Sequence, residues 1–330
     1  MTGDALDPVS RLTALAREDM RAVETLLAER MASETDIIPK VARYLVEAGG
    51  KRIRPLITVA SARMLGYEGE GHIALASAVE FIHSATLLHD DVVDDSDLRR
   101  GKTPANQVWS NPHSVLVGDF LFARAFMMMV DAGSMPALHV LSRAAAVIAE
   151  GEVRQLAAVR DIAVSREAYM GIIEAKTAEL FAAAAHVSPI LSGAGSELEA
   201  ALETYGRELG LAFQLVDDAL DYGGLAADLG KNTGDDFREG KITLPLALAL
   251  EAADAGERAF WERTIADLDQ REGDFDEAVR LMNAHGALDA TLAQARGHAR
   301  AAVNALDAAP KNVWSEALVA LAEFVVERAY

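Results

Sequence analysis

The sequence contains no cysteine among its 330 residues. This absence excludes disulfide bonds, thiolate nucleophiles, iron–sulfur clusters and zinc–thiolate sites. It also favours the cytoplasm, the compartment in which proteins rarely use disulfides. Any catalytic chemistry has to come from carboxylates, amines, guanidinium groups, hydroxyls, imidazoles or bound ions.

Basic residues are scarce relative to acidic ones. Lys and Arg total 31 against 51 Asp and Glu, so the net charge is −20. A charge of this sign excludes broad electrostatic attraction to nucleic acid or to an anionic membrane surface. An anionic ligand would need a local basic cluster or a metal ion.

Long apolar runs are missing as well. The chain begins with acids where a secretory signal would carry an apolar segment, and no uninterrupted apolar stretch reaches about 20 residues. We therefore expect a cytoplasmic protein without a transmembrane segment and without a nucleic-acid partner.

Alternating strand-like patterns are rare, and apolar residues recur every three or four positions along almost the whole chain. Breaks rich in Gly, Pro, Asn and Ser separate these segments, for example at Gly66–Gly71, "DAGSMP" and "SPILSGAGS". No linker divides the chain, and 51% hydrophobic residues can fill a large core. The pattern predicts an all-α protein in which residues 1–330 form one large helical bundle.

The first concentration of charge is "LLHDDVVDDSDLRRG", at the end of an expected helix that follows Gly71. Asp90 and Asp94 lie one turn apart and Asp91 stands beside them. Like charges at this spacing repel, so a group of opposite sign is expected nearby. Two carboxylates about 6 Å apart can flank a hard divalent cation such as Mg²⁺.

A second cluster, "FQLVDDALD", repeats the spacing with Asp217, Asp218 and Asp221. Each cluster could be a solvated helix end, but two D-D-x-x-D patterns with basic loops behind both favour metal binding. Mg²⁺ usually shares its coordination with substrate phosphates. The two clusters together predict a site for a magnesium-bound phosphate compound.

Positive side chains gather in four short segments of this acidic chain. Arg matches phosphate oxygens with its planar fork, and Lys supplies a compact charge. For Arg52, Lys102 and Arg238 we favour surface salt bridges, whereas the set as a whole suits a ligand with a diphosphate head and a hydrocarbon tail. The segments contribute Lys51, Arg52 and Arg54; Arg99, Arg100 and Lys102; Lys176 with Thr177; and Lys231, Arg238 and Lys241.

These motifs resemble those of the trans-isoprenyl diphosphate synthases, or polyprenyl synthetases. The resemblance runs from about Leu45 to Leu250, and the motifs follow one another in the family's order. Among the members, the chain most resembles the long-chain octaprenyl and decaprenyl diphosphate synthases. It implies an all-α isoprenoid synthase fold with a central elongation cavity, and a homodimer. The matching segments are "GGKRIRP", "LLHDDVVDDSDLRRG", "EGEVRQL", "KTAELF", "FQLVDDALDY" and "GKNTGDDFREGKITLP".

The resemblance also implies residue roles. The metal ligands would be Asp90, Asp91, Asp94, Asp217 and Asp221, with Asp218 and the lysines Lys176 and Lys231 in the same catalytic centre. Isopentenyl diphosphate would be held by Lys51, Arg54, His83 and Arg100, and the allylic diphosphate by Arg99, Lys176, Thr177, Gln214, Lys231 and Lys241. With substrate bound, the site would hold up to about three Mg²⁺ ions.

Product length depends on the residues before the first aspartates. Short-chain members of the family usually carry bulky aromatics where this chain has Ala85 and Thr86, while Ile82 and Phe81 lie one turn further down the helix. Small residues permit a long product, of about C40 to C50, but do not count its units. A shorter-chain geranylgeranyl diphosphate synthase and a catalytically silent subunit of a heteromeric synthase stay open as alternatives. The resemblance also suggests a role in making quinone side chains.

Overall fold

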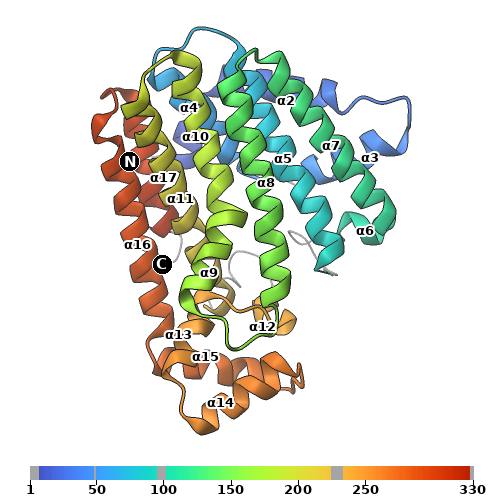
Figure 1. Cartoon of the computed structure of the whole chain (residues 1–330), viewed down its shortest axis with the longest axis vertical. Coiled ribbons are helices and arrows are strands. Elements are labelled where there is room, and N and C mark those ends of the chain that lie inside the picture. Colours follow the sequence, from blue (N-terminus) through green and yellow to red (C-terminus); the bar gives the residue numbers. More distant parts are fainter. Residues whose placement is uncertain (1–6, 48–49, 95–101, 224–232, 328–330) are drawn as a thin grey trace, which may run out of the picture. The chain divides into compact units, whose positions relative to one another are not determined.

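The computed structural model describes residues 7–47, 50–94, 102–223 and 233–327 (Figure 1), and no strand occurs in those ranges. The predicted all-α class is therefore confirmed. The first helices are α1 (Pro8–Leu15), α2 (Arg17–Arg30), α3 (Ile37–Glu47), α4 (Ile53–Met64), α5 (Gly71–Val93), α6 (Ala105–Val108), α7 (Asn111–Asp131), α8 (Met135–Ala158) and α9 (Arg166–Ile173). A π-helical turn, η1 (Glu174–Ala178), precedes α10 (Glu179–Ser192), α11 (Ser196–Tyr222), α12 (Asp235–Glu239), α13 (Leu244–Ala252) and α14 (Ala255–Trp261). The chain ends with the π turn η3 (Glu262–Ala266), α15 (Asp274–Ala284), α16 (Ala287–Ala305), the 3₁₀ turn η4 (Leu306–Ala308) and α17 (Val313–Glu327).

The chain divides into two compact units, each assembled from separate stretches of sequence. Unit 1 comprises Met1–Ala145, Leu180–Gly206 and Val303–Leu321, and unit 2 comprises Ala146–Glu179, Arg207–Ala302 and Ala322–Tyr330. No Gly- or Pro-rich linker marks the division. The interpretation of residues 1–330 as one domain stays a prediction.

In unit 1, α5 is the central helix and packs along α7 (Figure 1). Many of its apolar residues, among them Leu75, Val79 and Leu88, are fully buried. By length and apolar composition alone α5 and α7 could each span a membrane, but 67% of the α5 window and 39% of the α7 window are buried inside the protein. Burial of most of the window is typical of a core helix, which describes α5 and not α7, and the absence of a transmembrane segment stays a prediction.

In unit 2, two apolar clusters fix the helices around the end of α11. One includes Tyr222, Phe237 and Trp261, and the other includes Tyr169 and Leu215. Each cluster joins residues from helices far apart in the sequence, which is how a helical core positions loops and helix ends. The C-terminal end of α11, with the second aspartate motif, is thereby held in place.

The predicted helix breaks at Gly66–Gly71 and "DAGSMP" are confirmed, since α4 and α7 end there. The break predicted at "SPILSGAGS" begins later than expected, because α10 continues through Pro189 to Ser192. A helix accepts an internal proline at the cost of one backbone hydrogen bond. Gly193 and Gly195, at φ +63° and +88°, mark the break, since this left-handed conformation suits glycine.

Candidate active site

The first aspartate motif lies at the C-terminal end of α5. Asp90 and Asp94 are half-buried and Asp91 is fully buried. The backbone N–H of Asp94 donates to the carbonyl of Asp90 at 2.8 Å, which extends the helical pattern to this residue. The C-terminal end of a helix carries partial negative charge, so three carboxylates there favour an added cation. The sequence therefore placed this motif correctly on a helix end.

His89 fixes the same helix end against α7. Its ring stacks on Phe122 with centroids 6.1 Å apart, and its Nε2 lies 3.2 Å from the carbonyl oxygen of Val115. A Cβ atom on Gly118 would lie only 2.3 Å from this nitrogen, so glycine at this position of α7 leaves the room that the ring occupies. The sequence analysis missed His89, although it immediately precedes the aspartates.

Three predicted ligands of isopentenyl diphosphate also belong to unit 1. Lys51 is exposed just before α4, Arg54 is half-buried in its first turn, and His83 is half-buried on α5. The guanidinium carbon of Arg54 lies 4.4 Å from the centroid of the Phe181 ring. Arg99 and Arg100 lie outside the described residues.

The predicted chain-length residues lie on α5, below the aspartates. Phe81, Ile82 and Ala85 are fully buried, whereas Thr86 is half-buried and donates its hydroxyl to the carbonyl of His83 at 2.8 Å. Their role in product length stays a prediction.

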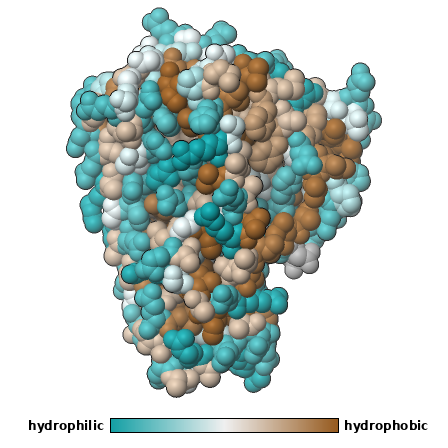
Figure 2. All heavy atoms as spheres, in the orientation of Figure 1, coloured by the Kyte–Doolittle hydropathy of each residue, from teal (hydrophilic) through white to brown (hydrophobic). Residues whose placement is uncertain are grey.

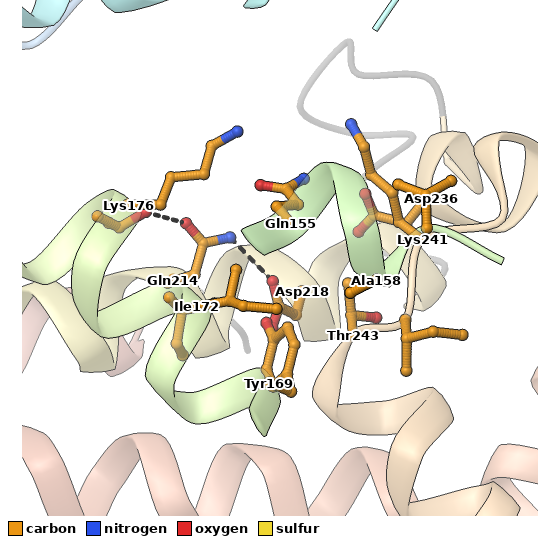
Figure 3. A pocket seen from close by; sticks show the side chains of 14 residues that line it. Gln155, Ala158, Tyr169, Ile172, Lys176, Gln214, Asp218, Asp236, Lys241 and Thr243 are labelled. Atoms are coloured by element: carbon orange, nitrogen blue, oxygen red, sulfur yellow. Dashed lines mark hydrogen bonds between the residues drawn. The ribbon is translucent and has the colours of Figure 1, made fainter. Parts of the chain in front are cut away.

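A pocket of about 170 Å³ in unit 2 brings together five of the predicted residues. Figure 3 shows Lys176 and Lys241 extending to the same side of this pocket, with Asp218 and Tyr169 deeper in it. The predicted residues in its wall are Lys176, Thr177, Gln214, Asp218 and Lys241. Sequence patterns did not single out the lining residues Gln155, Tyr169, Asp236 and Thr243, although Gln155, Asp236 and Thr243 lie inside the matching segments.

A chain of hydrogen bonds crosses this pocket (Figure 3). The hydroxyl of Thr177 donates to Gln214 Oε1 at 2.8 Å, and Gln214 Nε2 donates to Asp218 Oδ1 at 2.9 Å. The hydroxyl of Tyr169 donates to the other carboxylate oxygen of Asp218. Because every member has a partner, the chain holds the Gln214 amide in one orientation.

Burial controls the charge of the carboxyl groups in this region. Desolvation raises the pKa of Asp218 to about 7, against the opposing effect of the hydrogen bonds from Tyr169 and Gln214. Desolvation also raises the pKa of Asp236 well above its usual range, and the neighbouring charge of Asp221 adds to this effect. The site therefore concentrates buried carboxyl groups with too little positive charge around them to favour ionisation. A bound cation would supply that charge.

Asp221 has a further contact that the sequence analysis did not foresee. Its carboxylate accepts backbone N–H groups from Gly234 and Asp235 at 3.2 Å and from Asp236 at 3.0 Å. These groups open α12, so Asp221 fastens that helix to the end of α11. Its pKa is nonetheless raised, mainly by burial. Asp217 is half-buried on the same turn of α11.

Lys176 and Thr177 are displayed by the π-helical turn η1. Lys176 Nζ lies 2.7 Å from Glu152 Oε2, which joins the turn to α8. A Cβ atom on Gly151 would lie 2.9 Å from both the Ala175 Cβ and the Lys176 backbone nitrogen. π-helical turns are often found at functional sites because they re-aim side chains. Gly151 allows α8 to approach this turn closely.

The remaining basic residues divide into several cases. Lys241 pairs with Glu239 at 2.5 Å, and Lys231 lies outside the described residues. Arg238 forms the expected surface salt bridge with Asp235, and Lys102 is exposed. Arg52 forms the expected salt bridge, with Glu80, but its predicted surface location is wrong, because Glu80 is only 3% exposed.

Within the ranges that the structure describes, no group of three or more His, Asp or Glu side chains is arranged to hold a metal ion. The carboxylates of unit 2 nevertheless fit a hard divalent cation, because they offer oxygen ligands and because burial raises the pKa of Asp218, Asp221 and Asp236, a cost that a bound cation would offset. Lys176 and Lys241 add positive charge beside them, which suits an anionic ligand. Together these groups can bind and stabilise a departing phosphate group.

The profile of the polyprenyl synthetase family matches residues 35–282. The chain belongs to this family, which confirms the resemblance inferred from its motifs. It is 47% identical over 323 residues to the octaprenyl diphosphate synthase of Escherichia coli K12, covering 98% of this chain and 99% of that one.

Two solved structures are similar along almost their entire length. One is a polyprenyl synthase from Caulobacter crescentus complexed with calcium and isoprenyl diphosphate, at 55% identity and a TM-score of 0.94, covering 98% of both chains. The other is a decaprenyl diphosphate synthase from Rhodobacter capsulatus, at 51% identity and a TM-score of 0.94, covering 98% of this chain and 99% of that one.

Proposed function

We propose that this protein is a long-chain all-trans polyprenyl diphosphate synthase. It condenses isopentenyl diphosphate onto an allylic primer such as farnesyl diphosphate and releases products of about C40 to C50, used for quinone side chains. The observation that carries this proposal is the pocket that joins Lys176, Thr177, Gln214 and Lys241 beside the second aspartate motif. Full-length similarity to octaprenyl and decaprenyl diphosphate synthases supports the long product.

The pocket of unit 2 is assigned to the allylic diphosphate. Lys176 and Lys241 extend to one side of it and offer charge to phosphate oxygens (Figure 3). The isopentenyl diphosphate is assigned to Lys51, Arg54 and His83 in unit 1. By resemblance Arg99 and Lys231 join the first site and Arg100 joins the second.

The cofactor in this proposal is Mg²⁺, with up to about three ions once substrate is bound. The ligands would be Asp90, Asp91, Asp94, Asp217 and Asp221. With Mg²⁺ bound, this site would supply the positive charge that neutralises the departing diphosphate. The calcium and isoprenyl diphosphate in the Caulobacter crescentus structure support a divalent cation with a diphosphate ligand.

In the reaction the allylic C–O bond breaks, and its electron pair leaves with the diphosphate. Lys176 and Lys241 stabilise that leaving group, and Thr177 and Gln214 line the same pocket beside it. The double bond of isopentenyl diphosphate attacks the cation, and a proton then passes from the new allylic unit to the released diphosphate. The apolar side chains of Ile172 and Ile173 help to exclude water from the cation.

A homodimer is the assembly that the surface favours. Helix α7 exposes Leu116 (67%), Met127 (48%) and Val130 (63%), which recur at helical spacing, and Figure 2 shows apolar residues over this helix. A second copy would bury this stripe. Sedimentation of wild type and Val130→Asp tests the assignment, since the charged variant is expected to sediment as a monomer.

The absence of cysteine is the support for a cytoplasmic location.

A product assay tests the activity. The purified chain is incubated with Mg²⁺, farnesyl diphosphate and labelled isopentenyl diphosphate, and the dephosphorylated products are sized by chromatography. Products ending near C40 to C50 support the proposal. A stop at C20 favours the geranylgeranyl alternative, and no incorporation by folded protein favours the silent-subunit alternative.

The aspartates are tested by single substitutions. Asp90→Ala and Asp217→Ala are expected to lower turnover by at least about a hundredfold, because each removes charge that holds the cation, while circular dichroism keeps its helical signal. Asp276→Ala is the control, since Asp276 is an exposed acid on α15. Loss of helical signal in the first two variants would identify the aspartates as structural.

A further inference from the structure

Arg52 lies between the predicted substrate ligands Lys51 and Arg54 and adopts an unusual backbone conformation. Its φ of +47° lies in the left-handed region, which non-glycine residues rarely adopt. Its carbonyl accepts the N–H of Leu56 at 3.0 Å, so this conformation sets the start of α4. Glycine would adopt this backbone conformation more easily, so the arginine at this position indicates a role for its side chain.

The side chain of Arg52 connects three helices of unit 1. Nη1 donates to Glu80 Oε1 on α5, and Nη2 donates to the carbonyl oxygen of Val46 near the end of α3 at 2.8 Å. Only 5% of the Glu80 side chain is exposed. A carboxylate buried to this degree needs a charged partner, so the pair is expected to persist in solution.

The turn that carries the two predicted ligands Lys51 and Arg54 is fixed by contacts to three other helices. Arg54 stacks on Phe181 of α10, at 4.4 Å, and Arg52 is fastened to α3 and α5. Lys51 precedes this anchored turn and exposes its side chain. The contacts of Arg52 therefore restrict the backbone position of Lys51, the residue before it.

Glu80 links this loop to the third predicted ligand. Glu80 and His83 lie three residues apart on α5, so they occupy the same face of the helix. Fastening Arg52 to Glu80 brings the segment that carries Lys51 and Arg54 onto the helix face that carries His83. One ion pair thus connects both elements of the predicted diphosphate site.

We propose that the Arg52–Glu80 ion pair is a positioning clasp for the isopentenyl diphosphate site. Neither residue is assigned a contact with substrate; the clasp holds Lys51 and Arg54 at the distance from His83 that one diphosphate group requires. This inference rests on the proposed function, which assigns those three residues to isopentenyl diphosphate.

Arg63 provides a matched control on the same helix. It lies in the last turn of α4 and donates from Nε and Nη2 to the two carboxylate oxygens of Asp19, each at 2.6 Å. Losing this pair is expected to lower stability without moving any residue assigned to substrate. Arg52 also borders a pocket of about 280 Å³, so truncating it enlarges an existing space and creates no steric clash.

The test measures steady-state kinetics for Arg52→Gly, which keeps the left-handed backbone and removes the clasp. The KM for isopentenyl diphosphate is expected to rise about 10- to 100-fold, while the KM for farnesyl diphosphate changes less than about threefold. Glu80→Gln keeps the shape of the side chain and should give a smaller rise. The double variant should be no worse than Arg52→Gly, because both changes remove one interaction.

Arg63→Met is expected to lower the melting temperature and leave both KM values unchanged. Equal changes in both KM values for Arg52→Gly, or an equal rise for Arg63→Met, would overturn the clasp. If Arg52→Gly does not fold, Glu80→Gln carries the same comparison. Lys51→Ala separates the two proposals: a raised KM for isopentenyl diphosphate with normal Arg52→Gly kinetics overturns the clasp alone, whereas no effect of Lys51→Ala overturns the site assignment and the clasp with it.

Discussion

Replacing Asp218 by Asn should stabilise the metal-free protein at neutral pH while lowering its activity. Asp218 is 2% exposed, and burial raises its pKa from 3.8 to about 7. Holding its ionised form inside the protein therefore costs folding free energy. Asn has nearly the same shape and no charge, so this cost disappears in the variant.

The sign of the pH dependence follows from where the proton is bound. Below pH 3.8 both the folded and the unfolded protein carry the proton, and the charge makes no difference. Between pH 3.8 and about 7 the unfolded chain releases the proton and the folded protein keeps it, so stability is lost as the pH rises through this window. Above about pH 7 both states have released the proton, and the loss of unfolding free energy stays constant. The advantage of the Asn variant should therefore grow from pH 4 to pH 7 and then level off.

The magnitude can be set from the same values. The difference between 3.8 and about 7 corresponds to about 4 kcal/mol at neutral pH. Tyr169 and Gln214 each donate to a different oxygen of the carboxylate, whereas the amide of Asn offers only one acceptor oxygen, so one of the two buried donors loses its acceptor. This loss takes back about 2 kcal/mol, which leaves roughly 2 kcal/mol. For 330 residues the unfolding entropy makes this a rise of about 3 °C in melting temperature.

The assay is thermal unfolding followed by circular dichroism at pH 5, 6, 7 and 8 in the presence of a chelator. Asp276→Asn, at an exposed acid, is the control and should shift the melting temperature little at any pH. An Asn variant that is less stable than wild type at pH 8, or a difference that is the same at pH 5 and pH 8, would refute the reasoning. Turnover of the variant should fall in either case, because the hydrogen-bond chain that orients Gln214 in the pocket is disturbed.

Three further substitutions test other parts of the site. Ala85→Phe should shorten the products with little change in melting temperature. The control Ala76→Phe, at a buried site on the opposite face of α5, should lower the melting temperature by overpacking. If Ala85→Phe lowers the melting temperature and leaves the products unchanged, Ala85 belongs to the packed core. Gly151→Ala should lower kcat about tenfold, because the added Cβ displaces the turn that carries Lys176; unchanged kcat would mean that the turn adjusts freely. Arg100→Ala should raise the KM for isopentenyl diphosphate more than that for the primer, and equal effects would contradict the division into two substrate sites.

Much of the fold was predictable because helical periodicity is a local signal. The spacing of apolar residues indicated helices, and glycines at Gly66 and Gly133 marked their ends. Asp90 and Asp94 could be placed on one face of a helix from their spacing alone. Pro189 misled the analysis, since a proline inside a helix weakens it by one hydrogen bond without always ending it.

The contacts that complete the site were beyond the reach of sequence patterns. Tyr169 meets Asp218 across 49 residues, and Arg52 meets Glu80 across 28. Neither pair has a characteristic spacing, because each depends on how separate helices pack. For the same reason Arg52 looked like an ordinary surface cation until its partner was known to be buried.

The sequence by itself determined the helical class, the two aspartate motifs and, through the order of its motifs, the family. These properties depend on residue types at short spacings, which the local geometry of a helix converts directly into shared faces. Tertiary structure alone decided which groups are buried, and therefore which carboxyls resist ionisation and which ion pair holds the loop at Lys51. Burial and long-range contacts come from the packing of many helices at once, and no single stretch of sequence contains that information.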